Sequence, residues 1–443
     1  MPYRAGTRLP GERASRLGHL EVVKSPLVQE LVSSFEDSSS PRLPTSMSWE
    51  PMQQAGMPLP LVFGVDGSFQ VIESPTPPYK ALGFVKTALF RIDQPALAQL
   101  DRDSPHPYAL RDILTDSALY HATVFPLRHI AISGMSVYDA VRQTIFESVK
   151  DPQLSGEAME TLKWIAYEKW NGGGRDLPPF ECPHCESQNA TLPYNEEKGR
   201  CPDCGKELFI TDMLGFHLEM APDSAPDGVA RDYMTIHETL LLFTGIRYFW
   251  EHNRDALRRS LFVKDGPLRI RAQYSKLVEP IRRFLAMARD AGIQVCVLGQ
   301  EKSGAFADHL ALIGDSAPIG SVFVPGHQYI REQIQHRPVA GAPYGKDTNY
   351  GAKVFVRLTD RHKMTLNIPT GEFVQDPTVA NLIGAPQIFA TLPTLLSSRY
   401  EDGLLPVELA NAVASLSTYP SVQILTLFAE SKAQGHAGKP SSP

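Results

Sequence analysis

Strong positive charge, long apolar segments and abundant cysteine are all missing from this sequence of 443 residues. The formal net charge is −6, so binding to nucleic acid would depend on local basic patches rather than on the field of the whole protein. No apolar run approaches the length of a transmembrane helix, and the N-terminus carries arginines without the apolar stretch of a signal peptide. The five cysteines are too few for a disulfide-dense secreted scaffold, and we expect a cytoplasmic protein.

Hydrophobic residues make up 42% of the chain and charged residues 21%, which indicates a folded protein with a large core. The length allows two or three domains, or one core with insertions. We predict an N-terminal arm with a short helix (1–54) that contacts a partner or a second copy, a core in two parts (55–170 and 216–432), an insertion (171–215) and a disordered tail (433–443).

Apolar periodicity predicts an α/β protein with a mixed sheet flanked by helices. An antiparallel meander is expected to begin at the strand before Asp66, and the helix over 232–252 is apolar around much of its circumference, which indicates burial. Helices are predicted near 27–35, 137–149, 158–170, 232–252, 277–285, 386–398, 406–416 and 421–431, and strands near 61–66, 69–72, 82–92, 260–265, 293–298, 354–358 and 364–368.

Four of the five cysteines form two C-x-x-C pairs, Cys182 with Cys185 and Cys201 with Cys204, with fifteen residues between the pairs. This spacing is typical of a structural Zn²⁺ site of the zinc-ribbon type. A site closed by four thiolates has no open coordination position, so we do not expect it to be catalytic. His184 lies inside the first pair and could replace one cysteine, although four cysteines suffice.

The role of the ribbon stays open between two alternatives. It could only staple the insertion, or it could present Lys198, Arg200 and Lys206 to nucleic acid or to a partner. The fifth cysteine, Cys296, lies in an apolar strand and is expected to be a small buried side chain.

Two carboxylates repeat one pattern, in which an apolar strand ends in Asp-Gly: Asp66 with Gly67, and Asp265 with Gly266. By itself this pattern is also typical of an ordinary turn. Two strand-end carboxylates in one sheet could converge on a divalent cation, and phosphodiester hydrolysis with two metal ions needs such a cluster. A third acid could come from the helix between them, either from Glu238, among apolar residues, or from Glu251, in a charged run near the helix end.

The order of these motifs resembles the NurA nuclease family. The resemblance rests on Val65-Asp66-Gly67-Ser68, on the glutamate-bearing helix, on the FVKDGPL segment at 262–268 and on the VLGQEKSG segment at 297–304. The opening, from Gly11-Glu12 to Leu17-Gly18-His19, also resembles this family. The resemblance implies an RNase H-like core, a homodimer, and DNA cleavage with Mn²⁺ or Mg²⁺ together with the hexameric ATPase HerA.

The resemblance also implies roles for individual residues. Asp66, Glu238 and Asp265 would bind the catalytic metal ions, and Lys302 would hold the scissile phosphate, although Lys302 could equally be an exposed loop lysine. The zinc ribbon lies outside the common core of the family. A histidine that the family often carries near its C-terminus is absent, and Asn411 or Asp402 is a possible substitute.

We therefore expect a metal-dependent deoxyribonuclease that takes part in DNA end processing or defence. The alternative is a non-catalytic zinc-ribbon adaptor that binds DNA or an ATPase. A related enzyme acting on RNA or on a hybrid would share the same site.

Overall fold

The structure, a computed structural model, describes residues 22–35, 47–53, 57–92, 118–221, 228–397, 403–416 and 421–435. The chain divides into two units, residues 1–47 and 48–443, which are treated separately. In the first unit, α2 (Pro26–Ser34) confirms the predicted short helix, and none of its residues is buried. The predicted domain boundaries within the second unit remain predictions. Asp402 and the end of the tail lie outside the described residues.

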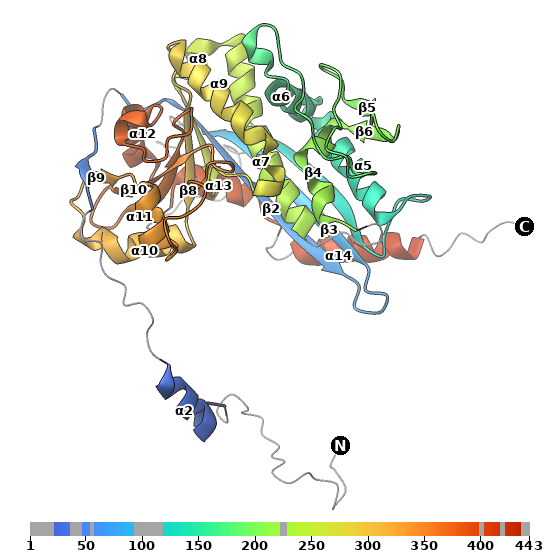
Figure 1. Cartoon of the computed structure of the whole chain (residues 1–443), viewed down its shortest axis with the longest axis horizontal. Coiled ribbons are helices and arrows are strands. Elements are labelled where there is room, and N and C mark those ends of the chain that lie inside the picture. Colours follow the sequence, from blue (N-terminus) through green and yellow to red (C-terminus); the bar gives the residue numbers. More distant parts are fainter. Residues whose placement is uncertain are drawn as a thin grey trace, which may run out of the picture. The chain divides into compact units, whose positions relative to one another are not determined.

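The second unit contains a nine-stranded mixed sheet in the order β1-β9-β10-β11-β8-β7-β2-β3-β4 (Figure 1). Strands β2, β3 and β4 form an antiparallel meander that begins at the Asp66 strand, as predicted, and β7 and β8 run parallel to β2. The α/β class with a mixed sheet is therefore confirmed. The strands are β1 Glu50–Pro51, β2 Leu61–Glu73, β3 Ala81–Ile92, β4 Ala118–Arg128, β7 Ser260–Asp265, β8 Cys296–Glu301, β9 Ser321–Phe323, β10 Ala352–Arg357 and β11 Lys363–Ile368.

Helices cover both faces of this sheet. The helix α5 has the predicted bounds, because the Ser136 hydroxyl caps its first turn by accepting a hydrogen bond from the Asp139 amide at 3.0 Å. The long helix α7 is buried along most of its length, as predicted. The helices of the second unit are α5 Val137–Val149, α6 Glu157–Ala166, α7 Gly228–His252, α8 Arg254–Arg258, α9 Val278–Asp290, α10 Ala305–Ile313, α11 His327–Tyr329, α12 Ala385–Thr391, α13 Leu405–Ala414 and α14 Ser421–Gly435.

Successive side chains of β2 point to opposite faces, and each face has its own apolar core. Phe63 and Val65 join the core that includes α7, whereas Val62 joins the core that includes α12 and α13. By this alternation, Asp66 points to the α13 face and Gly67 to the α7 face.

The predicted turn at Gly67 is wrong. Strand β2 continues through Asp66 to Glu73, since its second half pairs with β3 in unbroken register. What ends near Asp66 is the parallel pairing with β7, whose last partners are Val65 and Lys264. Gly67 instead allows α7 to come close. A Cβ at this position would lie 2.7 Å from Glu238 Oε1 and 2.6 Å from Met234 Cγ.

Two further differences affect the site. The strand predicted at 293–298 begins at Cys296 and ends at Glu301, so Lys302 follows it directly. Strand β4 was not predicted, although it completes the meander.

Candidate functional site

The four cysteines of the two C-x-x-C pairs form one compact cluster, with all four sulfurs within 4.8 Å of one another. The Sγ atoms of Cys182 and Cys204 are 3.8 Å apart, as are those of Cys185 and Cys201. Sulfurs placed tetrahedrally about 2.3 Å from a Zn²⁺ ion would be about 3.8 Å apart. The cluster therefore has the donors and the spacing to bind a structural metal such as zinc.

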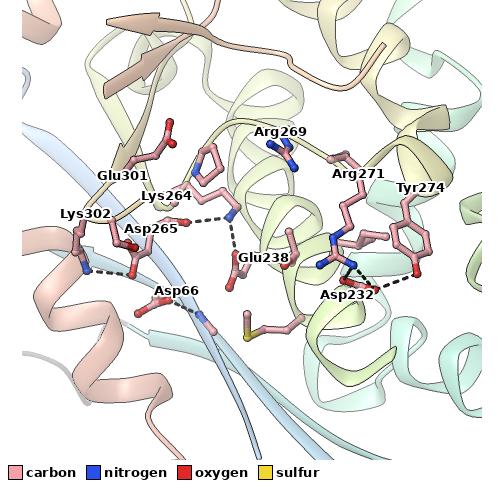
Figure 2. Close-up of a pocket in the computed structure, with 18 residues that line it drawn as sticks. Asp66, Asp232, Glu238, Lys264, Asp265, Arg269, Arg271, Tyr274, Glu301 and Lys302 are labelled. Carbon is pink, nitrogen blue, oxygen red and sulfur yellow. Dashed lines mark hydrogen bonds and ion pairs between the residues drawn. The ribbon is translucent and has the colours of Figure 1, made fainter. Parts of the chain in front are cut away.

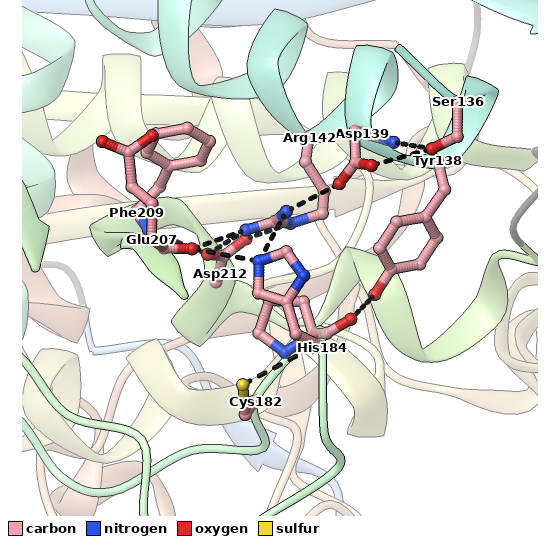
Figure 3. A network of polar contacts seen from close by, with 10 residues as sticks. Ser136, Tyr138, Asp139, Arg142, Cys182, His184, Glu207, Phe209 and Asp212 are labelled. Carbon is pink, nitrogen blue, oxygen red and sulfur yellow. Dashed lines mark hydrogen bonds and ion pairs between the residues drawn. The ribbon is translucent and has the colours of Figure 1, made fainter. Parts of the chain in front are cut away.

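His184 does not belong to the cluster, and its ring points away from Cys182 into a polar network with Arg142 (Figure 3). Its Nε2 atom is 3.1 Å from the carbonyl oxygen of Glu207 and 3.3 Å from Nη1 of Arg142. Only the backbone amide of His184 faces the cluster, donating to Cys182 Sγ at 3.4 Å.

A buried ion pair fixes the ribbon to α5. The guanidinium of Arg142 donates to both carboxylate oxygens of Asp212, at 3.0 and 2.9 Å, and both side chains are almost fully buried (Figure 3). Asp212 also accepts the backbone N–H of Phe209 at 2.8 Å, while the Phe209 ring stacks on Phe146 of α5. These contacts join the ribbon to the core of the second unit.

The ribbon cations are largely engaged with the ribbon itself. Lys198 lies over the rings of Phe146 and Phe209 and pairs with Glu207 at 3.8 Å. Arg200 donates to the carbonyl of Gly205 at 3.0 Å. Lys206 is exposed. All three side chains nevertheless stay exposed, so both alternatives for the role of the ribbon remain open.

The predicted acids Asp66, Glu238 and Asp265 all line one pocket of about 580 Å³, and Lys302 lies at its side (Figure 2). The pocket opens where β7 and β8 end and where α7 passes over Gly67. The rival glutamate, Glu251, is not among the pocket residues and pairs with Arg247 at 3.2 Å. Asn411 is exposed on α13 and does not line the pocket.

Asp66 is 6% exposed, and its described hydrogen bond is from the backbone N–H of Gly67, at 2.7 Å. Burial raises the pKa of Asp66 to about 8, and the negative charges of Asp265 and Glu238 contribute to the increase. The nearby Lys302 offsets this effect only in part. Asp66 is thus a carboxylate that would gain from an additional positive charge.

Glu238 is 3% exposed and has a cationic partner that the sequence analysis missed. The Nζ atom of Lys264 donates to Glu238 Oε2 at 2.5 Å and to the Asp265 carbonyl at 2.9 Å. Burial raises the pKa of Glu238, and Lys264 opposes that increase. Burial would lower the pKa of Lys264, but the charge and hydrogen bond of Glu238, together with Tyr350 and Asp265, raise the pKa overall. The two groups therefore form a buried ion pair.

Asp265 is the most accessible of the three predicted acids. Its side chain is 25% exposed and pairs with Lys302 Nζ at 3.0 Å. Lys302 therefore reaches into the site, as the resemblance implies, but its described partner is a carboxylate.

Glu301 is a further pocket acid that the sequence analysis did not single out. It accepts a hydrogen bond from Asn367 Nδ2 at 2.6 Å and forms an ion pair with buried Lys353. The sequence signal was present, because Asp265 ends one parallel strand and Glu301 ends the next.

The pocket offers hard carboxylate oxygens, the donors that Mg²⁺ and Mn²⁺ prefer. The carboxylates nevertheless are not arranged as a complete set of metal ligands. Within the described part of the chain, the cysteine cluster alone brings three or more ligand atoms within 4.8 Å of one another. Glu238 and Asp265 each hold a lysine, so Asp66 is the acid best placed to accept a divalent ion.

Comparison with protein-family models and with curated proteins found no match for this chain. In the described ranges, none of the helices combines the length and the apolar character needed to cross a membrane.

Proposed function

We propose that this protein is a metal-dependent DNA nuclease of the NurA type. In this proposal, the meander β2-β3-β4 with the parallel strands β7 and β8 is the RNase H-like core. The protein would act as a homodimer in the cytoplasm, together with a HerA-like hexameric ATPase, in DNA end processing or defence.

The observation that carries the proposal is the convergence of Asp66, Glu238 and Asp265 on one pocket. These residues come from two strands and a helix, and almost 200 residues separate the first from the last. A buried carboxylate such as Asp66, with acids beside it and its pKa raised, favours a bound cation.

Asp66 and Asp265 would hold Mn²⁺ or Mg²⁺, with Glu238 reaching them past Gly67. The chemistry supplied by such an ion is Lewis-acid polarisation of the scissile phosphodiester. Lys302 would exchange Asp265 for a phosphate oxygen of the substrate and so orient it. Lys264 would keep Glu238 ionised inside the protein. Zn²⁺ in the cysteine cluster would hold the ribbon on α5 and take no part in the reaction.

The test is degradation of fluorescently labelled DNA by the purified protein with Mn²⁺. We expect Asp66→Ala and Asp265→Ala to reduce cleavage to background while the thermal unfolding midpoint does not fall. Glu251→Ala is the matched control on α7 and should cleave like the wild type, since Glu251 is outside the pocket. Equal cleavage by Asp66→Ala and the wild type would refute the assignment.

A second candidate function is a non-catalytic adaptor that binds DNA or an ATPase. It is favoured by the two lysines that already pair with Glu238 and Asp265. Titration with Mn²⁺ separates the two functions. An adaptor would show the same weak Mn²⁺ binding in the wild type and in Asp66→Ala, whereas a nuclease would lose a binding site in the variant.

A further inference from the structure

A second hollow adjoins the acidic pocket. It has a volume of about 330 Å³ and shares two lining residues, Glu301 and Lys302, with the acidic pocket. Its other walls come from α10 and from the turn and strand at 360–365. The two hollows therefore meet at Glu301 and Lys302.

Positive side chains occur along both hollows. In the acidic pocket, Arg271 lies at one end and Lys302 at the other, with Glu238 and Asp265 between them (Figure 2). Arg269 is exposed along the same wall. In the adjoining hollow, Arg361 is exposed, and Lys363 pairs with Asp315 at 2.8 Å.

The acids of this route are mostly inside the protein or already paired. Asp232 pairs with Arg271 at 3.1 Å, and Glu301, at the junction, pairs with Lys353. Asp360 is exposed on the wall of the second hollow, but Arg357 lies 3.7 Å from it. Three cations of the route are paired in the same way: Arg271, Lys302 and Lys363. Arg269 and Arg361 are exposed and form no ion pair within the described part of the chain, so they can contact phosphates.

The depth of the carboxylates decides which form of nucleic acid fits. Asp66 and Glu238 are 6% and 3% exposed, so a phosphodiester must enter the pocket to approach them. A strand held in a duplex would have to distort locally to place a phosphate that deeply, whereas a single strand can bend into a groove.

We propose that the hollow formed by Lys302, Arg361 and Lys363 is a second binding site for a single nucleic-acid strand. It takes the phosphates that continue beyond the acidic pocket. This inference rests on the proposed function, because it treats the acidic pocket as the place where the strand is cut. Arg361 is the main determinant, since no described side chain partners its guanidinium.

The experiment measures binding of fluorescein-labelled oligothymidylates of about 6 and 20 nucleotides by the full chain. EDTA removes loosely bound divalent ions, so binding is observed without cleavage. Each lost phosphate contact on a single strand lowers the slope of log K against log salt by about 0.7, or about fivefold in affinity at 0.1 M salt. We expect Arg361→Ala to show this loss with the long oligonucleotide and Arg361→Lys to retain the slope.

Arg258→Ala is the control, because Arg258 is an exposed cation that pairs with Asp255 and lines neither hollow. An unchanged slope in Arg361→Ala, or no binding of the long oligonucleotide, would overturn the inference. Equal binding of a blunt duplex with the same dependence on Arg361 would overturn the single-strand assignment.

The binding readout is independent of cleavage. Arg361-dependent binding without cleavage in Mn²⁺ would leave the second site standing and refute the nuclease. Cleavage in Mn²⁺ together with an unchanged slope in Arg361→Ala would support the nuclease and refute the second site.

Discussion

The cysteine cluster and the acidic pocket differ in how complete they are as metal sites. The cysteines place four soft donors at tetrahedral spacing, and no lysine or arginine of the described chain pairs with them. In the acidic pocket, lysines hold two of the three predicted acids, and the third, Asp66, has a raised pKa. The cysteine cluster is arranged to hold a metal ion permanently. In the acidic pocket, a metal ion would have to displace the proton of Asp66 and the lysines that pair with Glu238 and Asp265. Such exchange suits a working site better than a structural one.

The largest effect should come from opening the cysteine cluster. We expect Cys201→Ser to reduce bound zinc from about one ion per chain to near zero, and to lower the free energy of unfolding by more than about 5 kcal/mol, because zinc binding is coupled to folding. Cys201 is 2% exposed and belongs to the core that contains α7, so the damage should extend beyond the ribbon. Elemental analysis and urea unfolding measure both effects. Cys296→Ala is the control and should keep its zinc, since Cys296 is buried away from the cluster, as predicted.

A smaller effect should follow from releasing the ribbon while its cysteines stay intact. Asp212→Ala leaves Arg142 buried beside an empty position and removes the acceptor for the Phe209 amide. We expect a loss of about 3–5 kcal/mol in urea unfolding. Asp139→Ala removes a different, 45% exposed partner of the same arginine and should cost less than about 1 kcal/mol. Equal losses for the two variants would show that burial does not set the strength of this contact.

A different kind of effect, a dependence of stability on pH, should appear at the acidic pocket. Because the folded-state pKa of Asp66 is about 8 and its unfolded value is about 3.9, folding takes up a proton between these limits. The contribution of Asp66 to stability therefore falls as pH rises from about 4 to 8, by up to about 1.4 kcal/mol per pH unit. Asp66→Asn should remove this slope, and thermal unfolding at a series of pH values measures it.

Adding Mn²⁺ gives a second test of the Asp66 carboxylate. If Asp66 binds the ion, saturating Mn²⁺ should flatten the pH profile of the wild type and leave that of Asp66→Asn unchanged. Parallel profiles for the wild type and Asp66→Asn without metal would contradict the raised pKa.

The same contrast explains what the sequence could predict. The cysteines lie within 23 residues of one another, and a local spacing rule was enough to identify the cluster. The acids required the strand order. Asp66 and Asp265 each follow a recognisable apolar segment, whereas Glu238 lies among apolar residues within α7. Lys264 carried no such signal, because a single lysine in an apolar strand does not reveal that its partner is on α7, 26 residues away. Glu301 was missed because the strand was predicted to end three residues early.

The architecture followed the apolar periodicity where segments were long. The helix α5 and the hairpin of β10 and β11 lie where they were predicted. Short strands such as β1 and β9, with two and three residues, contain too few positions to show an alternation. Gly67 was assigned to a turn for a different reason. A sequence does not distinguish a glycine that allows a turn from one that allows a neighbouring helix to pack closely.

The room at Gly67 has a mechanical consequence. Glu238 belongs to a helix of 25 residues, and its carboxylate passes the sheet at Gly67, where β2 presents no side chain. A ligand that brings this carboxylate closer to Asp66 acts on a side chain of α7, and α7 is held in place because it is embedded in the larger core. The rigidity of that core therefore limits how closely the Glu238 and Asp66 carboxylates can approach each other past Gly67.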